Sequence, residues 1–227
     1  MARDMKIIRA RDMAIINEAD TMGPSRRQFL KVTAAGVVNG VTASILSVPS
    51  SAFAAERRTG NVLIAYFSRT GNTREVAHQI HQRVGGDIME IRTTHSYPED
   101  YRATTEQAKQ ELETRFRPQL TTEVNNMDSY DMVFIGYPIW WNTLPMAFFT
   151  FLEKYRFDRK TLMPFCTHEG SQLGRSMTDI KALCPSSTIL EGLALRGGKS
   201  GYVKSETARR DVAEWLGKLH IQQSDDH

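Results

Sequence analysis

The chain has 227 residues, of which 41% are hydrophobic and 24% are charged. These proportions suit one globular domain, or a domain with an appendage, and they exclude a chain that is disordered throughout. Two cysteines are too few for a disulfide scaffold or a four-cysteine zinc site. The formal net charge of +3 would indicate an acidic or nucleic-acid partner only if the excess cations belong to the folded part.

Residues 1–54 predict an export signal. The motif Ser25-Arg26-Arg27-Gln28-Phe29-Leu30-Lys31 precedes a weakly apolar stretch over 32–47, and Ala52-Phe53-Ala54 forms an A-x-A cleavage site. This order is typical of a secretory signal, and the paired arginines resemble the twin-arginine signal. We therefore expect cleavage after Ala54 and a linker over 55–60. A transmembrane anchor is the alternative, but no window of about 18 to 20 residues there is continuously apolar.

The signal accounts for the net charge of the chain. Residues 1–54 hold seven Lys or Arg and four Asp or Glu, which leaves 22 residues of each sign in the remaining 173. The charge therefore offers no argument for a nucleic-acid or anionic membrane partner. Residues 1–24 are longer than a signal needs before its arginines, so the true start is open between Met1, Met5, Met13 and Met22.

The remaining residues alternate between strand and helix patterns. Short apolar runs predict five strands, over 61–67, 87–92, 131–137, 161–167 and 187–193. Helical patterns lie between and after them, with apolar faces over 76–84, 144–155, 173–183 and 208–219. This alternation predicts a doubly wound α/β domain with a parallel sheet. Pro164 cannot donate a ladder hydrogen bond, so either a local irregularity accommodates it or the fourth strand has other bounds.

Three loops and one insertion are the places to look for function. Ligands of open α/β sheets bind outside the carboxyl ends of the strands, here in the loops after strands one, three and four. The stretch 95–127, with a polar helix over 102–116, is a surface insertion that could shape a substrate pocket or a partner surface.

The first loop predicts a phosphate site. It consists of Ser68-Arg69-Thr70-Gly71-Asn72-Thr73, whose hydroxyls and glycine adjoin the free N–H groups of a helix N-terminus. It lacks the patterns G-x-x-x-x-G-K-[ST] and G-x-G-x-x-G, so a terminal phosphate monoester is expected rather than a triphosphate or a dinucleotide. A helix cap rich in Ser and Thr is the alternative. The motif S-x-T-G-N-T after a first strand resembles the phosphate loop of the flavodoxin family, which binds flavin mononucleotide (FMN).

This resemblance covers about residues 60–220. It implies a flavodoxin-like FMN-binding domain over 61–222, with strand order 2-1-3-4-5, helices on both faces and no metal. Residues 68–73 would hold the phosphate. In the second loop the predicted cofactor-binding residues are Pro138, Ile139, Trp140, Trp141, Asn142 and Thr143. In the third loop they are Thr167, His168, Glu169, Gly170, Ser171 and Gly174.

Several of these residues carry more specific expectations. Side chains alternate along the chain, so Trp140 and Trp141 should have different roles, one of them in the core. Related proteins often have a small residue and a glycine in place of His168 and Glu169. A lone histidine on a surface loop is usually solvated, which makes His168 a secondary candidate. Cys166 and Cys184 should lie about one helix length apart and remain unbridged.

FMN would carry the chemistry, so no catalytic side chain is required. The favoured prediction is an electron carrier that works outside the cytoplasm, in the periplasm or an equivalent compartment. Its partners would be redox proteins or a small acceptor such as a quinone, together with the twin-arginine export machinery. The first alternative is an NAD(P)H-dependent quinone, nitro or azo reductase. The second is a flavin-binding module without turnover.

Overall fold

The computed structural model describes residues 61–198 and 201–221. The predicted signal over 1–54, the linker over 55–60 and the last residue of the predicted domain lie outside this range. The strands are β1 (Val62–Tyr66), β2 (Asp87–Glu90), β3 (Met132–Pro138), β4 (Thr161–His168), β5 (Thr188–Ile189) and β6 (Leu193–Arg196). The helices are α1 (Asn72–Val84), α2 (Tyr101–Thr114), α3 (Met146–Lys154), α4 (Ser176–Leu183) and α5 (Glu206–Lys218), with 3₁₀ turns η1 (Met127–Ser129) and η3 (Tyr202–Lys204).

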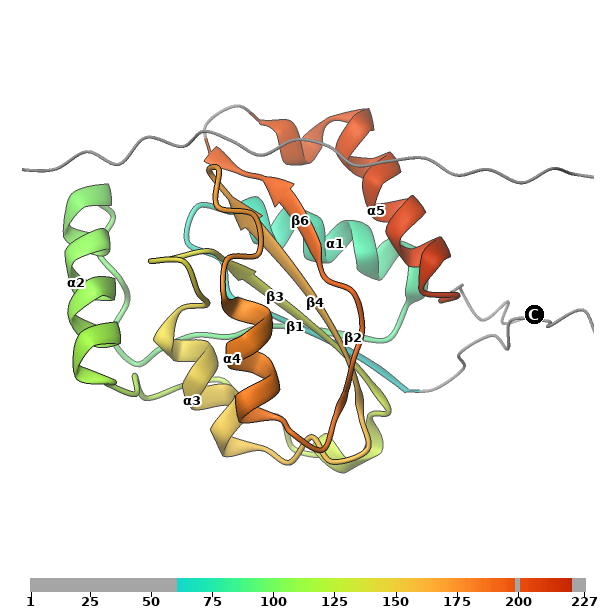
Figure 1. Cartoon of the computed structure of the whole chain (residues 1–227), viewed down its shortest axis with the longest axis horizontal. Helices are drawn as coiled ribbons and strands as arrows, with labels where there is room; N and C mark the ends of the chain where they lie inside the picture. The colour runs from blue at the N-terminus through green and yellow to red at the C-terminus, as the bar shows by residue number, and fades with distance from the viewer. Residues whose placement is uncertain (1–60, 199–200, 222–227) are drawn as a thin grey trace, which may run out of the picture. The chain divides into compact units, whose positions relative to one another are not determined.

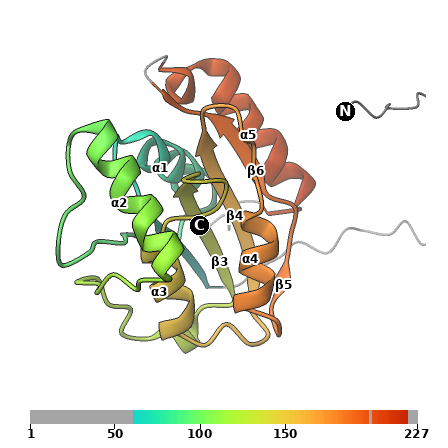
Figure 2. The ribbon, with the colours of Figure 1, turned by 60° about the vertical axis from the view of Figure 1, so that its left-hand side comes forward.

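The strands form one parallel sheet in the order β2-β1-β3-β4-β5, and β6 also pairs with β4. Helices α1 and α5 cover one face, and α3 and α4 cover the other (Figure 1). Helix α2 belongs to the predicted insertion and lies beside the sheet rather than over it (Figure 2). The doubly wound fold and its strand order are therefore as the sequence predicts.

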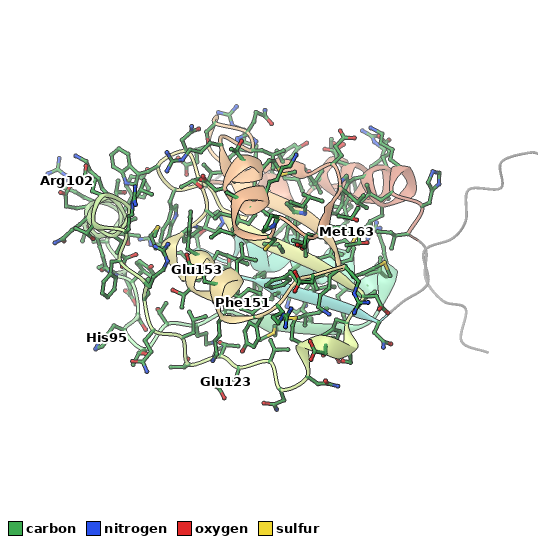
Figure 3. The ribbon with its side chains drawn as sticks, turned by 60° about the horizontal axis from the view of Figure 1, so that its bottom comes forward. His95, Arg102, Glu123, Phe151, Glu153 and Met163 are labelled. Carbon is green, nitrogen blue, oxygen red and sulfur yellow. The ribbon has the colours of Figure 1, made fainter. Side chains whose placement is uncertain are left out.

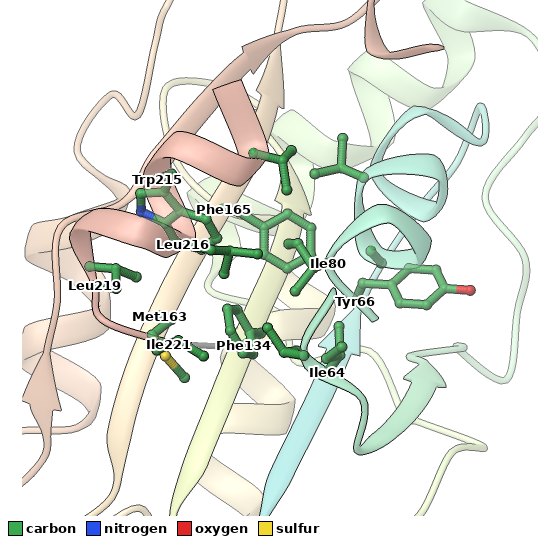
Figure 4. Close-up of a cluster of buried hydrophobic side chains, with 14 of the residues drawn as sticks. Ile64, Tyr66, Ile80, Phe134, Met163, Phe165, Trp215, Leu216, Leu219 and Ile221 are labelled. Atoms are coloured by element: carbon green, nitrogen blue, oxygen red, sulfur yellow. The ribbon is translucent and has the colours of Figure 1, made fainter. Parts of the chain in front are cut away.

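The continuous apolar runs of β1 and β3 are explained by the cores on both faces of the sheet. Ile64 and Phe134 face α1 and α5, whereas their neighbours Leu63 and Val133 face α3 and α4. Figure 4 shows the first core, in which the side chains of α1 and α5 meet those of the central strands. Because both faces of the sheet are covered by apolar side chains, a strand with alternating apolar and polar residues would bury polar side chains without partners here.

Phe165 and Gly136 show how tightly the first core is packed. The Phe165 ring is fully buried and lies over Gly136, where an added Cβ would be 2.1 Å from the ring's Cζ atom. Only glycine fits at this position. In Figure 3, Phe151 and Met163 lie within the body of the domain, whereas His95 and Arg102 of the insertion lie at its periphery.

The predicted fifth strand over 187–193 is wrong, because two short strands replace it. Leu162 pairs with Ile189 and Phe165 pairs with Leu193. The two residues 163–164 of β4 therefore lie opposite the three residues 190–192 that connect β5 to β6. Pro164 lies in this gap. The carbonyl of Leu162 accepts a hydrogen bond from Leu190, so the backbone groups of Leu162 face the edge strand. Residues two apart in a strand direct their backbone groups to the same side, so Pro164 also faces the edge strand, where it has no N–H to donate.

A one-residue bulge between β5 and β6 therefore accommodates the proline within an intact β4. It also moves the carboxyl end of the edge strand to Arg196. The other predicted helices and strands are present, with ends shifted by a few residues. Among the residues that the structure describes, no helix is both long enough and apolar enough to span a bilayer.

Candidate functional site

The three predicted loops meet at one edge of the sheet. Parallel strands β1, β3 and β4 all end there (Figure 1). The hydroxyls of Thr73 and Thr167 lie 2.9 Å apart, which joins the first loop to the end of β4. The backbone N–H of Arg175 donates to the carbonyl of Asn142 over 2.8 Å, which joins the second loop to the third. The sequence-predicted residues thus form one site.

The first loop has the features that an anionic group requires. Gly71 adopts a left-handed conformation (φ +88°) immediately before α1, and no side chain of residues 61–198 or 201–221 caps the first turn of that helix. The hydroxyl oxygen of Ser68 is buried and has no hydrogen-bond partner among the described residues. A buried polar atom without a partner carries a desolvation cost that a ligand could remove. The uncapped N–H groups and this hydroxyl fit a phosphate.

A shallow hollow continues from this loop along α1. It has a volume of about 410 Å³ and is lined by Thr70, Gly71 and Asn72 together with Arg74 and Lys204. The side-chain amide of Asn72 donates to the carbonyl of Gly198 over 3.1 Å, so the loop after β6 closes one side. Glu75 also lines the hollow, and Arg74 is paired with Glu90, so Lys204 is the lining cation that no ion pair of the described residues neutralises.

The side chain of Arg69 points elsewhere. Its guanidinium donates to the carbonyls of Pro98 (3.4 Å) and Glu99, both in the insertion. Arg69 therefore connects the phosphate loop to the segment before α2. Its predicted contact with the cofactor stays a prediction and would have to come from the backbone or from a rearranged side chain.

The second loop forms a tight turn at the end of β3. The backbone of Trp140 donates to the carbonyl of Thr143 over 2.8 Å, and Thr143 donates back over 3.0 Å. Trp141 and Asn142, between them, have positive φ angles of 48° and 66°, as the two central residues of a type I′ turn do. Asparagine tolerates this conformation, but a bulky residue such as tryptophan seldom adopts it. Ile139 is half-buried, and its backbone donates to the carbonyl of Thr167 over 2.9 Å.

The two tryptophans have different surroundings, as the alternation predicts, but the prediction that one of them lies in the core is wrong, because Trp140 is only half-buried against the core and Trp141 is exposed. The ring of Trp140 is half-buried and meets Phe67 and Tyr97 edge-on, with ring centroids 5.5 and 4.9 Å away. Trp141 is 45% exposed, and its indole N–H donates to the carbonyl of Thr105 in α2 over 2.9 Å. Trp140 therefore belongs to the support of the site, and Trp141 forms part of its open rim.

The third loop approaches the second closely at Gly174, because glycine has no Cβ. An added Cβ there would lie 2.4 Å from the carbonyl oxygen of Asn142. The hydroxyl of Thr143 also donates to Asp179 of α4 over 2.5 Å. In the same loop Glu169, Gly170 and Ser171 are exposed. The side chains of Glu169 and Ser171 and the backbone of Gly170 are accessible at the edge of the site, and their predicted contacts with a cofactor stay predictions.

His168 is not the solvated histidine that its loop position predicts. It is only 6% exposed, and its Nδ1 atom accepts a hydrogen bond from the backbone of Gly170 over 2.9 Å. Burial, and then the positive charge of Arg196, lower its pKa below the ordinary value. The histidine is therefore neutral at neutral pH, with its proton on Nε2. The expectation fails because β4 extends to His168 itself and buries it.

Two parts of the site were missed by sequence reasoning. Tyr97 supplies a third ring beside Phe67 and Trp140, yet it lies in the insertion, about 40 residues before Trp140 in the chain. The pair Gly197-Gly198 comes next to the first loop because the edge strand ends at Arg196 rather than at residue 193. The adjacent glycines Gly197 and Gly198 could have been recognised in the sequence as a candidate loop. No sequence pattern indicated that Tyr97 belongs to the site.

The two cysteines are buried and free. Burial raises the pKa of Cys166 to about 12 and that of Cys184 to about 11. The Cys166 thiol donates to the carbonyl of Gln172 over 3.5 Å. Both thiols are therefore inert packing groups. Within the described part of the chain, no three His, Cys, Asp or Glu side chains are arranged to hold a metal ion.

Comparison with known proteins agrees with the fold. A protein from Bacteroides eggerthii, assigned by its description as a flavoprotein, is 31% identical with a TM-score of 0.62, over 72% of this chain and 100% of that protein. A similarly assigned protein from Bacteroides uniformis is 29% identical with a TM-score of 0.60, over 70% of this chain and 99% of that protein.

A more distant structure shows the same fold. The flavoprotein from Lactobacillus acidophilus, solved in complex with FMN, is 20% identical with a TM-score of 0.53, over 61% of this chain and 93% of that protein. No curated protein sequence matches the chain. The sequence model of the flavodoxin family matches residues 61–219, which is most of the chain and includes all three loops. The chain belongs to the flavodoxin family.

Proposed function

We propose that this protein binds FMN at the carboxyl edge of its sheet and transfers electrons through the flavin outside the cytoplasm. The observation that carries the proposal is the buried, unpartnered hydroxyl of Ser68 beside the uncapped N-terminus of α1. A phosphate group would satisfy both features at once. Membership of the flavodoxin family and the FMN bound by the Lactobacillus relative support the choice of ligand.

The described residues divide the binding task between two regions. Ser68, Thr70 and Thr73 would hold the phosphate, together with the first N–H groups of α1. The second and third loops, with the rings of Trp140 and Trp141, would hold the flat ring system and exclude water from one side of it. When bound, FMN supplies chemistry in steps of one or two electrons. The protein's own groups bind the cofactor and orient its ring.

Charge in the third loop would tune the flavin. His168 is neutral, so of the two unusual residues in this loop Glu169 is the one whose side chain could place negative charge beside the flavin. A nearby carboxylate disfavours added negative charge and so lowers a reduction potential. We therefore expect Glu169→Gln to raise the midpoint potential of the bound flavin.

The alternative activity is an NAD(P)H-dependent reductase for quinones, nitro compounds or azo compounds. One observation favours it. Residues 55–227 hold equal numbers of acidic and basic residues, whereas an electron carrier of this fold is expected to present an acidic face to its partner. The open rim at Trp141 would also leave room for a small acceptor.

The experiment that tests the proposal is to purify the full chain and the form without residues 1–54, and to identify bound flavin by absorbance and mass. Steady-state NAD(P)H oxidation with a quinone is then measured. Slow turnover with fast flavin reduction by a reductase protein supports the carrier, and fast turnover supports the reductase. Bound flavin with neither activity indicates a storage module. A protein that binds no FMN refutes all three.

Export is tested separately. The twin-arginine route carries folded proteins, so a flavin bound in the cytoplasm would travel with the protein. We expect the protein outside the cytoplasm to begin at Ala55, and we expect replacement of Arg26 and Arg27 by lysine to retain it in the cytoplasm. A wild-type protein found only in the cytoplasm would contradict this part of the proposal.

A further inference from the structure

Helix α2 of the insertion buries a carboxylate on its inner face, where a surface helix would ordinarily place an apolar side chain. Glu111 of α2 is only 5% exposed. One carboxylate oxygen accepts a hydrogen bond from the hydroxyl of Tyr97 over 2.7 Å, and the other accepts from the amide of Gln107 over 2.8 Å. Both donors are neutral, so the desolvation cost of the carboxylate is only partly offset. Leucine would pack here at lower cost, which indicates that the carboxylate has a specific task.

That task concerns the ring of Tyr97. The ring lies edge-on to Trp140 (4.9 Å between centroids) and to Phe67 (5.5 Å). Phe67 directly precedes the phosphate loop, and Trp140 belongs to the loop that would hold the flavin ring. Tyr97 thus joins two parts of the site that are separate in the sequence, although it comes from the insertion itself.

The chain directly after Tyr97 is held from two elements. The guanidinium of Arg69 donates to the carbonyls of Pro98 and Glu99. The hydroxyl of Thr104 in α2 donates to the carbonyl of Pro98 over 2.6 Å. The first loop and α2 therefore place the backbone next to Tyr97. The Tyr97 ring itself is held by its contacts with Trp140 and Phe67 and by the bond from its hydroxyl to Glu111.

We propose that Glu111 is a positioning residue for the cofactor site, because its carboxylate holds the Tyr97 ring against Trp140 and makes the insertion a wall of the flavin pocket. This inference rests on the proposed function. It assigns a role to the 95–127 insertion that the sequence left open between a substrate pocket and a partner surface. Burial, and then the bond to Glu111 and the charge of its carboxylate, raise the pKa of Tyr97 far above its ordinary value. The phenol therefore remains a donor throughout the working pH range.

The test is a double-mutant cycle with FMN as the probe. We expect Glu111→Leu and Tyr97→Phe each to raise the Kd for FMN by about 2- to 10-fold, which is the range of one good aromatic contact. Each should also change the visible circular dichroism of the bound flavin. Because Glu111 acts through Tyr97, the double variant should bind no more weakly than either single variant. Glu111→Gln keeps an oxygen that accepts from the phenol, so it should restore most of the affinity.

Glu113→Gln is the matched control, since Glu113 is an exposed glutamate on the same helix with only a long 3.9 Å pair to Lys109. It should leave both the Kd and the spectrum unchanged. Wild-type affinity and spectrum in Glu111→Leu would overturn the inference, and so would effects that add in the double variant. Loss of thermal stability with an unchanged flavin spectrum would show a merely structural role and would also overturn it. If the wild-type protein binds no FMN, the proposed function itself fails, which is a distinguishable result.

Discussion

Replacing Gly174 with alanine should separate the two loops that would hold the flavin ring. Gly174 has a φ of +53°, and Gln172 in the same loop has the same φ without being a glycine. Backbone conformation alone therefore does not require glycine at position 174. The close approach to Asn142 does, because an added Cβ would lie 2.4 Å from its carbonyl oxygen and 2.5 Å from its side-chain oxygen.

The cost can be worked from these distances. Ordinary contact needs about 3.5 Å, so Asn142 would have to move by about 1 Å. Overpacking of this kind costs about 1–3 kcal/mol, and the left-handed backbone adds about 1 kcal/mol for a residue with a Cβ. The 2.8 Å bond from the backbone of Arg175 to Asn142 would weaken as well, at about 0.5–1.5 kcal/mol. The expected total is about 2.5–5.5 kcal/mol.

Thermal unfolding measures this cost. At about 2–4 °C per kcal/mol for a domain of this size, Gly174→Ala should lower Tm by about 5–20 °C. Displacement of the ring loops should also raise the Kd for FMN by about tenfold. The control is Gly201→Ala, which has a similar left-handed φ of +68° and no atom within 4 Å of the added Cβ. It should lower Tm by only about 2–4 °C. Equal losses in the two variants would refute the steric argument.

Three further predictions follow from single groups. Ser68→Ala removes the buried hydroxyl without a partner, so it should leave the stability of the flavin-free protein unchanged or raise it by up to about 1 kcal/mol, as chemical denaturation would show. It should weaken FMN about tenfold but leave riboflavin, which has no phosphate, unaffected; equal losses for both ligands would contradict the assignment. His168 has a pKa below the 6.5 of the unfolded chain, so the unfolded state binds its proton more readily, and this residue's stabilisation is lost as the pH falls below about 6.5. His168→Asn should therefore reduce the loss of stability between pH 7 and pH 5, and an unchanged slope would show that His168 is not the group responsible. The raised pKa values of Cys166 and Cys184 keep both thiols protonated, so iodoacetamide at pH 8 should modify them only after denaturation. Rapid labelling of the native protein, followed by mass measurement, would show that one of them is accessible.

Much of the fold follows from local pattern. After their polar first residues, Asn61 and Asp131, the runs over 61–67 and 131–137 contain no charged or amide side chain on either face, as is typical of a strand covered on both faces. The glycine and hydroxyl groups of 68–73 mark a helix N-terminus whatever the rest of the chain does. Since parallel strands end at the same edge, these patterns also place the three predicted loops together. The α/β architecture and the general position of the three loops were therefore accessible from local pattern, and the strand order followed from the resemblance to the flavodoxin family.

Other features depend on which segments meet. The end of the edge strand depends on how β4 accommodates Pro164, and the one-residue bulge that does so brings Gly198 within 3.1 Å of Asn72. The burial of His168 depends on the length of β4, which is set by its pairing with two other strands.

The roles of Tyr97 and Glu111 depend on packing across the insertion. No spacing along the chain reveals that a tyrosine after β2 would face a tryptophan after β3. The sequence by itself determined the parallel α/β architecture and the chemistry of the phosphate loop, because hydrophobic period and turn residues act over a few neighbouring positions. Only the tertiary structure decided the contact of Tyr97 with Trp140, the burial of His168 and the position of Gly197-Gly198 beside the first loop, because each arises from contacts between segments that are distant in the chain.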